Sequence, residues 1–427
     1  MKDRLIGLYK NHRETIENLF WRALQTFGKQ GVTFVIFLLC ARFLTPHDFG
    51  IYNYVLAIVF LLIMFSDFGI ATATSKYVAE YNVADKEKLR VVIFNSAIII
   101  LSLTIIGVFL VIFFGPWYLK EKYNYVLCLL PLIFTAPMTS LYDGVYRGLK
   151  KFKQLSVISL CVGSISLVAI YFLVRRYGIY GALASQNLFD LVLLLSLAIG
   201  HKELHLRLNK SVIKEVGSYS LFYGLAVIGN YLFIRFGILI LGKFNYLEQI
   251  ATYELINKFF LIALMPFTLL GQVIAPNFAV FSRNQEYSKI KEKFLRFSVL
   301  FFIIGLLLGA LFYFLLPILF QIFFPQYFGK AYFGTTFILC LIVYVFNVWA
   351  ATIDFGIIVP SGYAPLMAKL YLALGVFGVI LDFVFIYTLG YIGVFLSFVI
   401  NSFFMFVLSR AIYLLAFKKR GKVLPTV

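Results

Sequence analysis

Basic side chains interrupt several long apolar segments of this sequence, and they are the residues whose types could do chemistry. Arg22 and Lys29 lie seven residues apart, on one face of a helix, and Arg235 and Lys258 lie in later apolar segments. Glu254 precedes Lys258 by one helical turn. An ionisable group in hydrocarbon is costly, so it normally faces a wet cavity, a partner or the interface. Because Arg and Lys bind phosphate oxygens through charge-assisted hydrogen bonds, we predict a cationic cavity for a phosphorylated or acidic substrate.

Other interpretations of these residues stay open. Arg22 lies close enough to the end of its segment to extend its charge to the interface. Glu254 and Lys258 can form a structural ion pair at a spacing of one turn. Arg235 has no partner nearby in the sequence, so its presence is the hardest to explain without a role in a substrate pathway.

Two acidic residues are candidates for ion coupling or gating, Asp67 and Asp354. Asp67 lies in the segment Ser66–Gly69, towards the inner end of an apolar stretch. There it can instead cap a broken helix or pair with Lys76, and both alternatives compete with coupling.

The elements that must position these residues are membrane-spanning helices. The chain has 427 residues, of which 62% are hydrophobic and only 13% are charged, whereas a soluble domain averages about 25% charged residues. One span needs about 20 apolar residues, and the apolar stretches number about twelve. The fifth and sixth are separated only by Arg175–Gly178. We therefore predict an all-α integral membrane protein, with about twelve transmembrane helices in two pseudo-symmetric six-helix bundles around a central cavity.

Most of the net charge of +19 comes from basic residues in the predicted loops. The predicted loops on one side of the membrane carry about 25 basic residues, and those on the other side carry about six. The side with the excess of basic residues is the cytoplasmic side. We therefore predict a multi-pass protein of the cytoplasmic (inner) membrane of a bacterium or archaeon, with both termini cytoplasmic and no nucleic-acid partner. The four histidines fall in loops, the four cysteines lack paired spacing, and no ATP-binding P-loop occurs. No metal, cofactor or catalytic residue is predicted, and the chain is expected to be a transporter rather than an enzyme.

The longest inner connection divides the chain near its middle. An offset of about 201 residues aligns Arg42-Phe43 with Lys243-Phe244 and Tyr52 with Tyr253, which favours an internal duplication of the kind common in transporters. The predicted boundaries are 1–18 for a cytoplasmic N-terminal segment, 19–200 for helices 1–6, 201–217 for a cytoplasmic linker, 218–417 for helices 7–12, and 418–427 for a basic cytoplasmic tail.

Three segments carry a resemblance to a known family: Ala41–Tyr52 (ARFLTPHDFGIY), Ser66–Ala73 (SDFGIATA) and Lys76–Tyr81 (KYVAEY). They resemble the opening of Wzx-type polysaccharide flippases, which belong to the multidrug/oligosaccharidyl-lipid/polysaccharide exporter superfamily. In that family an R-x-L-x-P-x-x-F/Y-G-x-Y loop joins the first two helices. The matching positions, for which the resemblance implies architectural or gating roles, are Arg42, Pro46, Gly50, Tyr52, Asp67, Gly69, Tyr77 and Glu80.

The resemblance implies a function in polysaccharide biosynthesis for the cell envelope, such as O-antigen export. Undecaprenyl-diphosphate-linked oligosaccharide would move from the inner to the outer leaflet by alternating access, coupled to a proton or sodium gradient. The implied partners are this lipid-linked glycan, membrane lipid, and the polysaccharide polymerase and chain-length machinery, and the chain is expected to be a monomer. The alternatives are a drug or organic-ion antiporter of the same fold, a lipid II flippase, and a membrane glycosyltransferase or polysaccharide polymerase.

Overall fold

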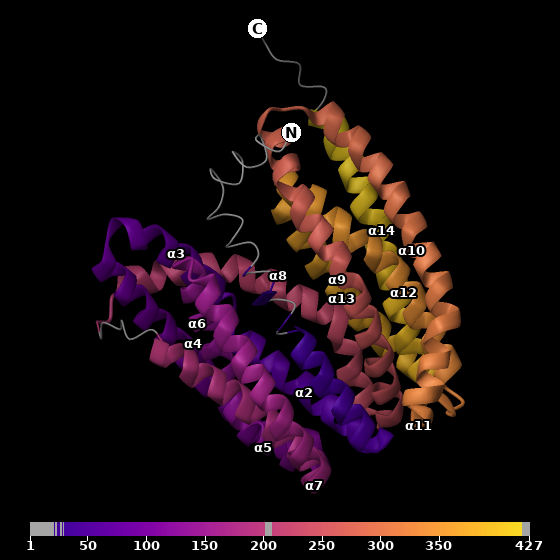
Figure 1. The fold of residues 1–427 in the computed structure, drawn as a ribbon. Helices are drawn as coiled ribbons and strands as arrows, with labels where there is room; N and C mark the ends of the chain where they lie inside the picture. Colours follow the sequence, from indigo (N-terminus) through magenta and orange to yellow (C-terminus); the bar gives the residue numbers. More distant parts are fainter. Residues whose placement is uncertain (1–20, 22–23, 26–27, 29, 201–206, 421–427) are drawn as a thin grey trace, which may run out of the picture. The chain divides into compact units, whose positions relative to one another are not determined.

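The computed structural model describes residues 21, 24, 25, 28, 30–200 and 207–420, and every regular element among them is a helix (Figure 1). Eight of the described helices are long and apolar enough to cross a membrane. The described residues form two compact units. Unit 1 contains the described residues up to Leu44 and residues Val55–Val227. Unit 2 contains residues Thr45–Tyr54 and the described residues from Ile228 onwards. The predicted all-α membrane fold is confirmed.

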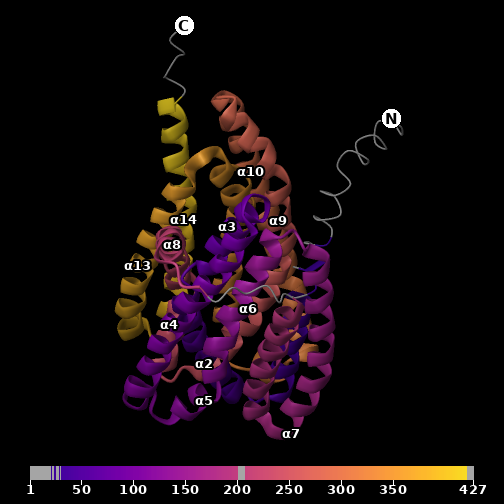
Figure 2. The same ribbon diagram turned by 90° about the vertical axis from the view of Figure 1, so that its left-hand side faces the viewer.

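Unit 1 consists of a bundle in which α6 packs against α3, α4 and α7, and α5 packs against α7 (Figure 2). Its helices are Gln30–Phe43, most of α2 (Pro46–Asp67), α3 (Ile70–Ala84), α4 (Lys86–Leu119), η1 (Lys120–Lys122), α5 (Tyr123–Cys128), α6 (Leu130–Gly148), α7 (Phe152–Gly200) and the first half of α8 (Lys210–Lys243).

Unit 2 is built around α12, which packs against α9, α10, α14 and η2, while α13 packs against α14 (Figure 1). Its elements are the start of α2, the second half of α8, α9 (Leu247–Arg283), α10 (Tyr287–Phe323), α11 (Pro325–Phe328), α12 (Phe333–Ile353), η2 (Asp354–Tyr363), α13 (Ala364–Leu389) and α14 (Tyr391–Arg420).

The helices account for the predicted spans once two of the eight are divided. α7 breaks at Gly178, whose φ of 55° is unfavourable for a residue with a side chain, and this break lies in the predicted connection Arg175–Gly178. The run from α12 to α13 breaks at Gly362. Together with α6 and the short apolar helix Gln30–Phe43, these segments match the twelve predicted spans within the part of the chain that the structure describes.

Helix register reproduces the predicted internal repeat. α2 begins at Pro46 and α9 begins at Leu247, which are 201 residues apart. Tyr52 and Tyr253 are consequently the seventh residue of their helices, and both side chains are buried. The two helices therefore start at corresponding points of the two halves.

α8 begins at Lys210, within the segment 201–217 that was predicted to be a linker. Asn95 of α4, which is fully buried, fixes the start of α8. The side-chain amide of Asn95 donates a hydrogen bond to the carbonyl of Arg207 at 2.9 Å and accepts one from the backbone N–H of Asn209 at 3.0 Å. Asn209 in turn accepts a bond from the N–H of Ser211 at the first turn of α8. The helix thus extends further towards the N-terminus than hydropathy indicates, because polar contacts order its first turn.

Candidate functional site

A buried charge cluster lies on two neighbouring helices of unit 2. Arg235 of α8 donates a hydrogen bond to the carboxylate of Glu254 on α9 and forms an ion pair with it. The Glu254 side chain is 4% exposed, whereas that of Arg235 is 32% exposed. Lys258, one turn after Glu254, is half-buried and lies within electrostatic range of both partners. The three side chains carry a net charge of +1 inside membrane-spanning helices.

The hairpin between α8 and α9 brings this cluster together. The chain reverses over Phe244–Tyr246, where Asn245 takes a positive φ of 63° and the N–H of Tyr246 donates to the carbonyl of Leu241. Sequence spacing left an ion pair between Glu254 and Lys258 open as one alternative. The structure instead pairs Glu254 with Arg235, because antiparallel helices place residues 19 positions apart face to face across the turn.

The remaining predicted cavity cations, Arg22 and Lys29, lie outside the described residues. A cluster assembled from both halves of the chain therefore stays a prediction, and the charge cluster described here belongs to unit 2 alone.

Beyond the first two turns of α2, α9 and α10, acidic and basic side chains in the spans of unit 2 differ in exposure. Glu254, Asp354 and Asp382 are 3%, 0% and 1% exposed. Ser409 donates to Asp354 at 3.1 Å and Ser397 donates to Asp382, so α14 supplies a hydroxyl to each aspartate. Neither aspartate forms an ion pair within the described chain. The basic side chains of these spans all retain exposed surface: Arg235, Lys258, Lys369 and Arg410.

Asp67 acts as a helix cap. α2 ends at this residue, Phe68 and Gly69 take positive φ values of 39° and 78°, and α3 follows at once. The carboxylate of Asp67 accepts a hydrogen bond from the N–H of Ala71 at 2.9 Å, which satisfies one of the free donors in the first turn of α3. Lys76, the alternative partner, lies 3.8 Å from Glu80 instead.

A pair of substitutions separates capping from proton or sodium coupling. We expect Asp67→Asn to retain transport and stability, because the amide oxygen can still accept the bond from Ala71. Asp67→Ala should lose about 0.5–2 kcal/mol of unfolding free energy, the usual effect of removing a cap. Thermal unfolding of the purified variants and transport rates at several pH values would check this. Abolished transport in a stable Asp67→Asn protein would assign coupling to this carboxyl group.

The residues that resemble the family motif hold helix contacts. Thr45 and Asp48 exchange hydrogen bonds at the start of α2, where Asp48 N–H donates to the Thr45 hydroxyl at 3.1 Å. Pro46 is the first residue of α2, Tyr52 is buried, and Arg42 is exposed. At Gly50, an added Cβ would lie 2.0 Å from the carbonyl oxygen of Leu247. The start of α2 therefore packs directly on the start of α9, within unit 2.

The second part of the motif anchors the start of α8 within unit 1. Tyr77 donates a hydrogen bond to the carbonyl of Glu215 at 3.3 Å, and its ring meets that of Tyr219 edge to face. An added Cβ on Gly69 would lie 2.9 Å from the Tyr223 ring. These contacts support the architectural interpretation of Tyr77 and Gly69.

Polar contacts also anchor the start of α9. Glu248 accepts hydrogen bonds from the Lys330 ammonium at 3.0 Å and from the Tyr332 hydroxyl at 2.8 Å. Burial, reinforced by the hydrogen bond to Glu248, holds the pKa of Tyr332 well above its ordinary value. The phenol therefore remains a donor throughout the physiological pH range.

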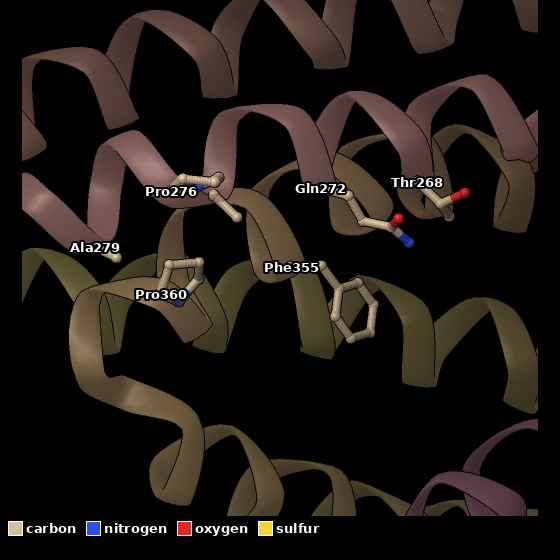
Figure 3. A pocket seen from close by; sticks show the side chains of 7 residues that line it. Thr268, Gln272, Pro276, Ala279, Phe355 and Pro360 are labelled. Carbon is tan, nitrogen blue, oxygen red and sulfur yellow. The ribbon is translucent and has the colours of Figure 1, made fainter. Parts of the chain in front are cut away.

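A pocket of 620 Å³ opens between α9 and η2 of unit 2 (Figure 3). It is lined by Thr268, Gln272, Ala275, Pro276 and Ala279 of α9 and by Phe355 and Pro360 of η2. The residues of this pocket were not among those predicted from the sequence to form a site. Its signal was a glutamine between two helix-disturbing residues, Gly271 and Pro276, inside an otherwise apolar span.

Known proteins match the chain at two levels. Residues 15–285 match a family described as polysaccharide biosynthesis protein, and no curated protein matches the sequence. Among solved structures, the fold is similar to an inward-facing multidrug resistance MATE family transporter of the MOP superfamily, with a TM-score of 0.74 and 15% identity, covering 92% of this chain and 96% of that one.

Two further solved structures share the fold at lower similarity. One is a MATE protein in complex with MaD3S, with a TM-score of 0.59, 17% identity and coverage of 94% of this chain and 97% of that one. The other is a MOP superfamily transporter from Pyrococcus furiosus Vc1 (DSM3638), for which reverse polarity of the binding pocket suggests a different function. Its TM-score is 0.54 at 14% identity, covering 96% of each chain.

Proposed function

We propose, from the premise that the chain belongs to the polysaccharide biosynthesis protein family, that it transports undecaprenyl-diphosphate-linked oligosaccharide from the inner to the outer leaflet. The family and the MATE fold together support a membrane transporter rather than an enzyme. Alternating access would move the charged head group through the protein while the lipid tail stays in the bilayer.

The observation that carries the substrate class is the polarity of the spans in unit 2. The carboxylates of Glu254, Asp354 and Asp382 are buried and bonded to arginine or serine, whereas the basic side chains keep exposed surface. An accessible cation in a low-dielectric region attracts anions such as a diphosphate. Lys258 is the residue on which this proposal depends most, because it adds a second positive charge beside the ion pair.

Organic-cation antiport is the competing function, since similar folds occur in multidrug transporters. It requires an accessible carboxylate to bind the cation. Among the described residues of unit 2, Glu254, Asp354 and Asp382 are the acidic residues away from the ends of the spans, and each is at most 3% exposed. The more exposed Glu248 and Glu292 lie in the first two turns of α9 and α10. This distribution favours the anionic substrate.

The cellular setting of the proposal follows from topology and substrate. Both termini would be cytoplasmic and the protein would lie in the inner membrane as a monomer. A proton or sodium gradient would drive transport, and the polymerase and chain-length machinery would receive the glycan on the outer side.

Leaflet-specific assays in proteoliposomes test the proposal. We expect the purified protein to move lipid-linked oligosaccharide and to show no saturable uptake of an organic cation such as tetraphenylphosphonium. Lys258→Glu should slow glycan transport about 10- to 100-fold, the effect of losing one charge-assisted hydrogen bond of about 1.5–3 kcal/mol, and Lys258→Arg should retain most of it.

The matched control is Lys291→Glu, which changes the same charge at an exposed position of α10 close to its start. Equal rates for the Lys258→Glu and Lys291→Glu proteins would remove Lys258 from the pathway. Uptake of the organic cation without glycan transport would replace the proposal by antiport.

A further inference from the structure

The pocket between α9 and η2 combines an aromatic ring with an amide. Phe355 is 52% exposed, and its ring lies on the same side of the pocket as the Gln272 amide (Figure 3). The Thr268 hydroxyl, one turn earlier on α9, donates to the carbonyl of Met265 at 2.7 Å and keeps its capacity as an acceptor. The pocket volume falls within the range of about 300–1,000 Å³ typical of small-molecule sites.

The Gln272 amide is the side-chain polar group of this pocket that is open to a ligand. Gln272 is exposed, and its side-chain amide makes no hydrogen bond to any part of the chain that the structure describes. Pro276 has no N–H, so the backbone carbonyl of Gln272 also loses its usual helical donor. A ligand that contacts Gln272 can therefore use both hydrogen-bond donors and acceptors, while the other lining residues except Thr268 present apolar surface.

These groups distinguish between ligand classes. An isoprenoid chain would bury the Gln272 amide without a hydrogen bond, at a substantial desolvation cost. A sugar ring presents hydroxyl groups at its edge and C–H groups on its faces. Its hydroxyls can bond the amide and the carbonyl, while its C–H face can pack on Phe355, because the face of an aromatic ring is electron-rich.

The pocket shares a helix face with the charge cluster. Gln272 follows Lys258 by fourteen residues and Glu254 by eighteen, close to four and five full turns of about 3.6 residues. At about 1.5 Å per residue, Gln272 lies about 21 Å from Lys258 along the axis of α9. One face of α9 thus presents a positive charge and, several sugar lengths away, a neutral hydrogen-bonding pocket.

We propose that the pocket formed by Gln272, Phe355 and Thr268 is a subsite for a neutral sugar ring of the transported glycan. This inference rests on the proposed function, since it assigns the glycan and the diphosphate to different parts of α9. Gln272 and Phe355 would determine the preference for a glycosylated carrier over the bare one, whereas Lys258 would contribute equally to the binding of both.

Binding to the full-length protein in nanodiscs tests this subsite, with two probes. One is undecaprenyl diphosphate, and the other is the pool of undecaprenyl-diphosphate-linked oligosaccharides extracted from the source cells. We expect wild type to bind the glycosylated probe more tightly. Gln272→Leu and Phe355→Ala should each reduce this preference about 5- to 10-fold, as expected for losing one neutral hydrogen bond or one ring contact. Affinity for bare undecaprenyl diphosphate should not change.

Two controls keep the experiment interpretable. Asn277→Leu removes an amide five residues further along α9, about 140° around the helix and outside the pocket, and should keep the preference. Phe355→Trp preserves an aromatic face and should retain it as well, which distinguishes sugar stacking from a folding role of Phe355.

The outcomes separate the subsite from the proposed function. An unchanged preference in Gln272→Leu, or an equal loss of affinity for both probes, would overturn the sugar subsite. If wild type binds neither probe, the proposed function fails. If wild type binds undecaprenyl diphosphate in a manner that requires Lys258 but shows no preference for the glycan, only the subsite is wrong.

Discussion

A Gly50→Ala protein should fail to accumulate as a folded protein, although the substitution adds one methyl group. The new Cβ would lie 2.0 Å from the carbonyl oxygen and 2.5 Å from the carbonyl carbon of Leu247. Both are backbone atoms at the start of α9, so no side-chain rotation relieves the clash. Overpacking in a core typically costs about 1–3 kcal/mol, and we expect at least the upper end here because two helices would have to separate.

Membrane abundance and thermal unfolding of the detergent-purified protein measure this effect. Gly334→Ala is the matched control, because it adds the same methyl group to a helix of unit 2 where nothing lies within 4 Å. The control should be neutral or stabilising by up to about 1 kcal/mol, the propensity advantage of alanine. Trimming the opposing side chain by Leu247→Ala should not rescue Gly50→Ala. Rescue, or wild-type stability of Gly50→Ala itself, would contradict the backbone contact.

Much of the fold could be predicted from the sequence because lipid imposes simple rules. Apolar length determines which segments span, and the break at Gly178 was visible as a polar connection between two apolar stretches. The predicted alignment of Tyr52 with Tyr253 also agrees with the positions of these residues in α2 and α9. The start of α2 is marked locally by residues such as Thr45 and Pro46. These features depend on neighbours in the sequence.

Features that depend on how helices rotate against one another could not be predicted in this way. Spacing offered Lys258 as one alternative partner of Glu254 and gave no sign of Arg235, which reaches the carboxylate across the α8–α9 hairpin. The pocket at Gln272 depends on the close approach of α9 and η2, where an added Cβ on Gly356 would lie 2.9 Å from the Cα of Gly271. Likewise, hydropathy does not indicate that Thr45–Tyr54 packs with unit 2, because the contact is made by a glycine that has no side chain.

The second large effect concerns the charge cluster, where removing the acid should harm the protein more than removing the arginine. Glu254→Gln leaves Arg235 and Lys258 close together without a carboxylate, so the cluster charge rises from +1 to +2. Breaking a buried ion pair costs about 3–5 kcal/mol. Arg235→Met leaves Glu254 beside Lys258, one turn away, and these two can then pair. We therefore expect Arg235→Met to be the milder substitution.

A double-mutant cycle measures the coupling and separates folding from transport. Arg235→Met/Glu254→Gln restores the cluster charge to +1 and should recover most of the stability lost in Glu254→Gln, as thermal unfolding would show. If Arg235 also contacts the anionic substrate, the double variant will fold normally and transport poorly. Additive losses of stability would show that the ion pair contributes little to the fold. Full transport by the stable double variant would leave Lys258 as the residue of the cluster that attracts the diphosphate, because its charge is then the only one that all active variants share.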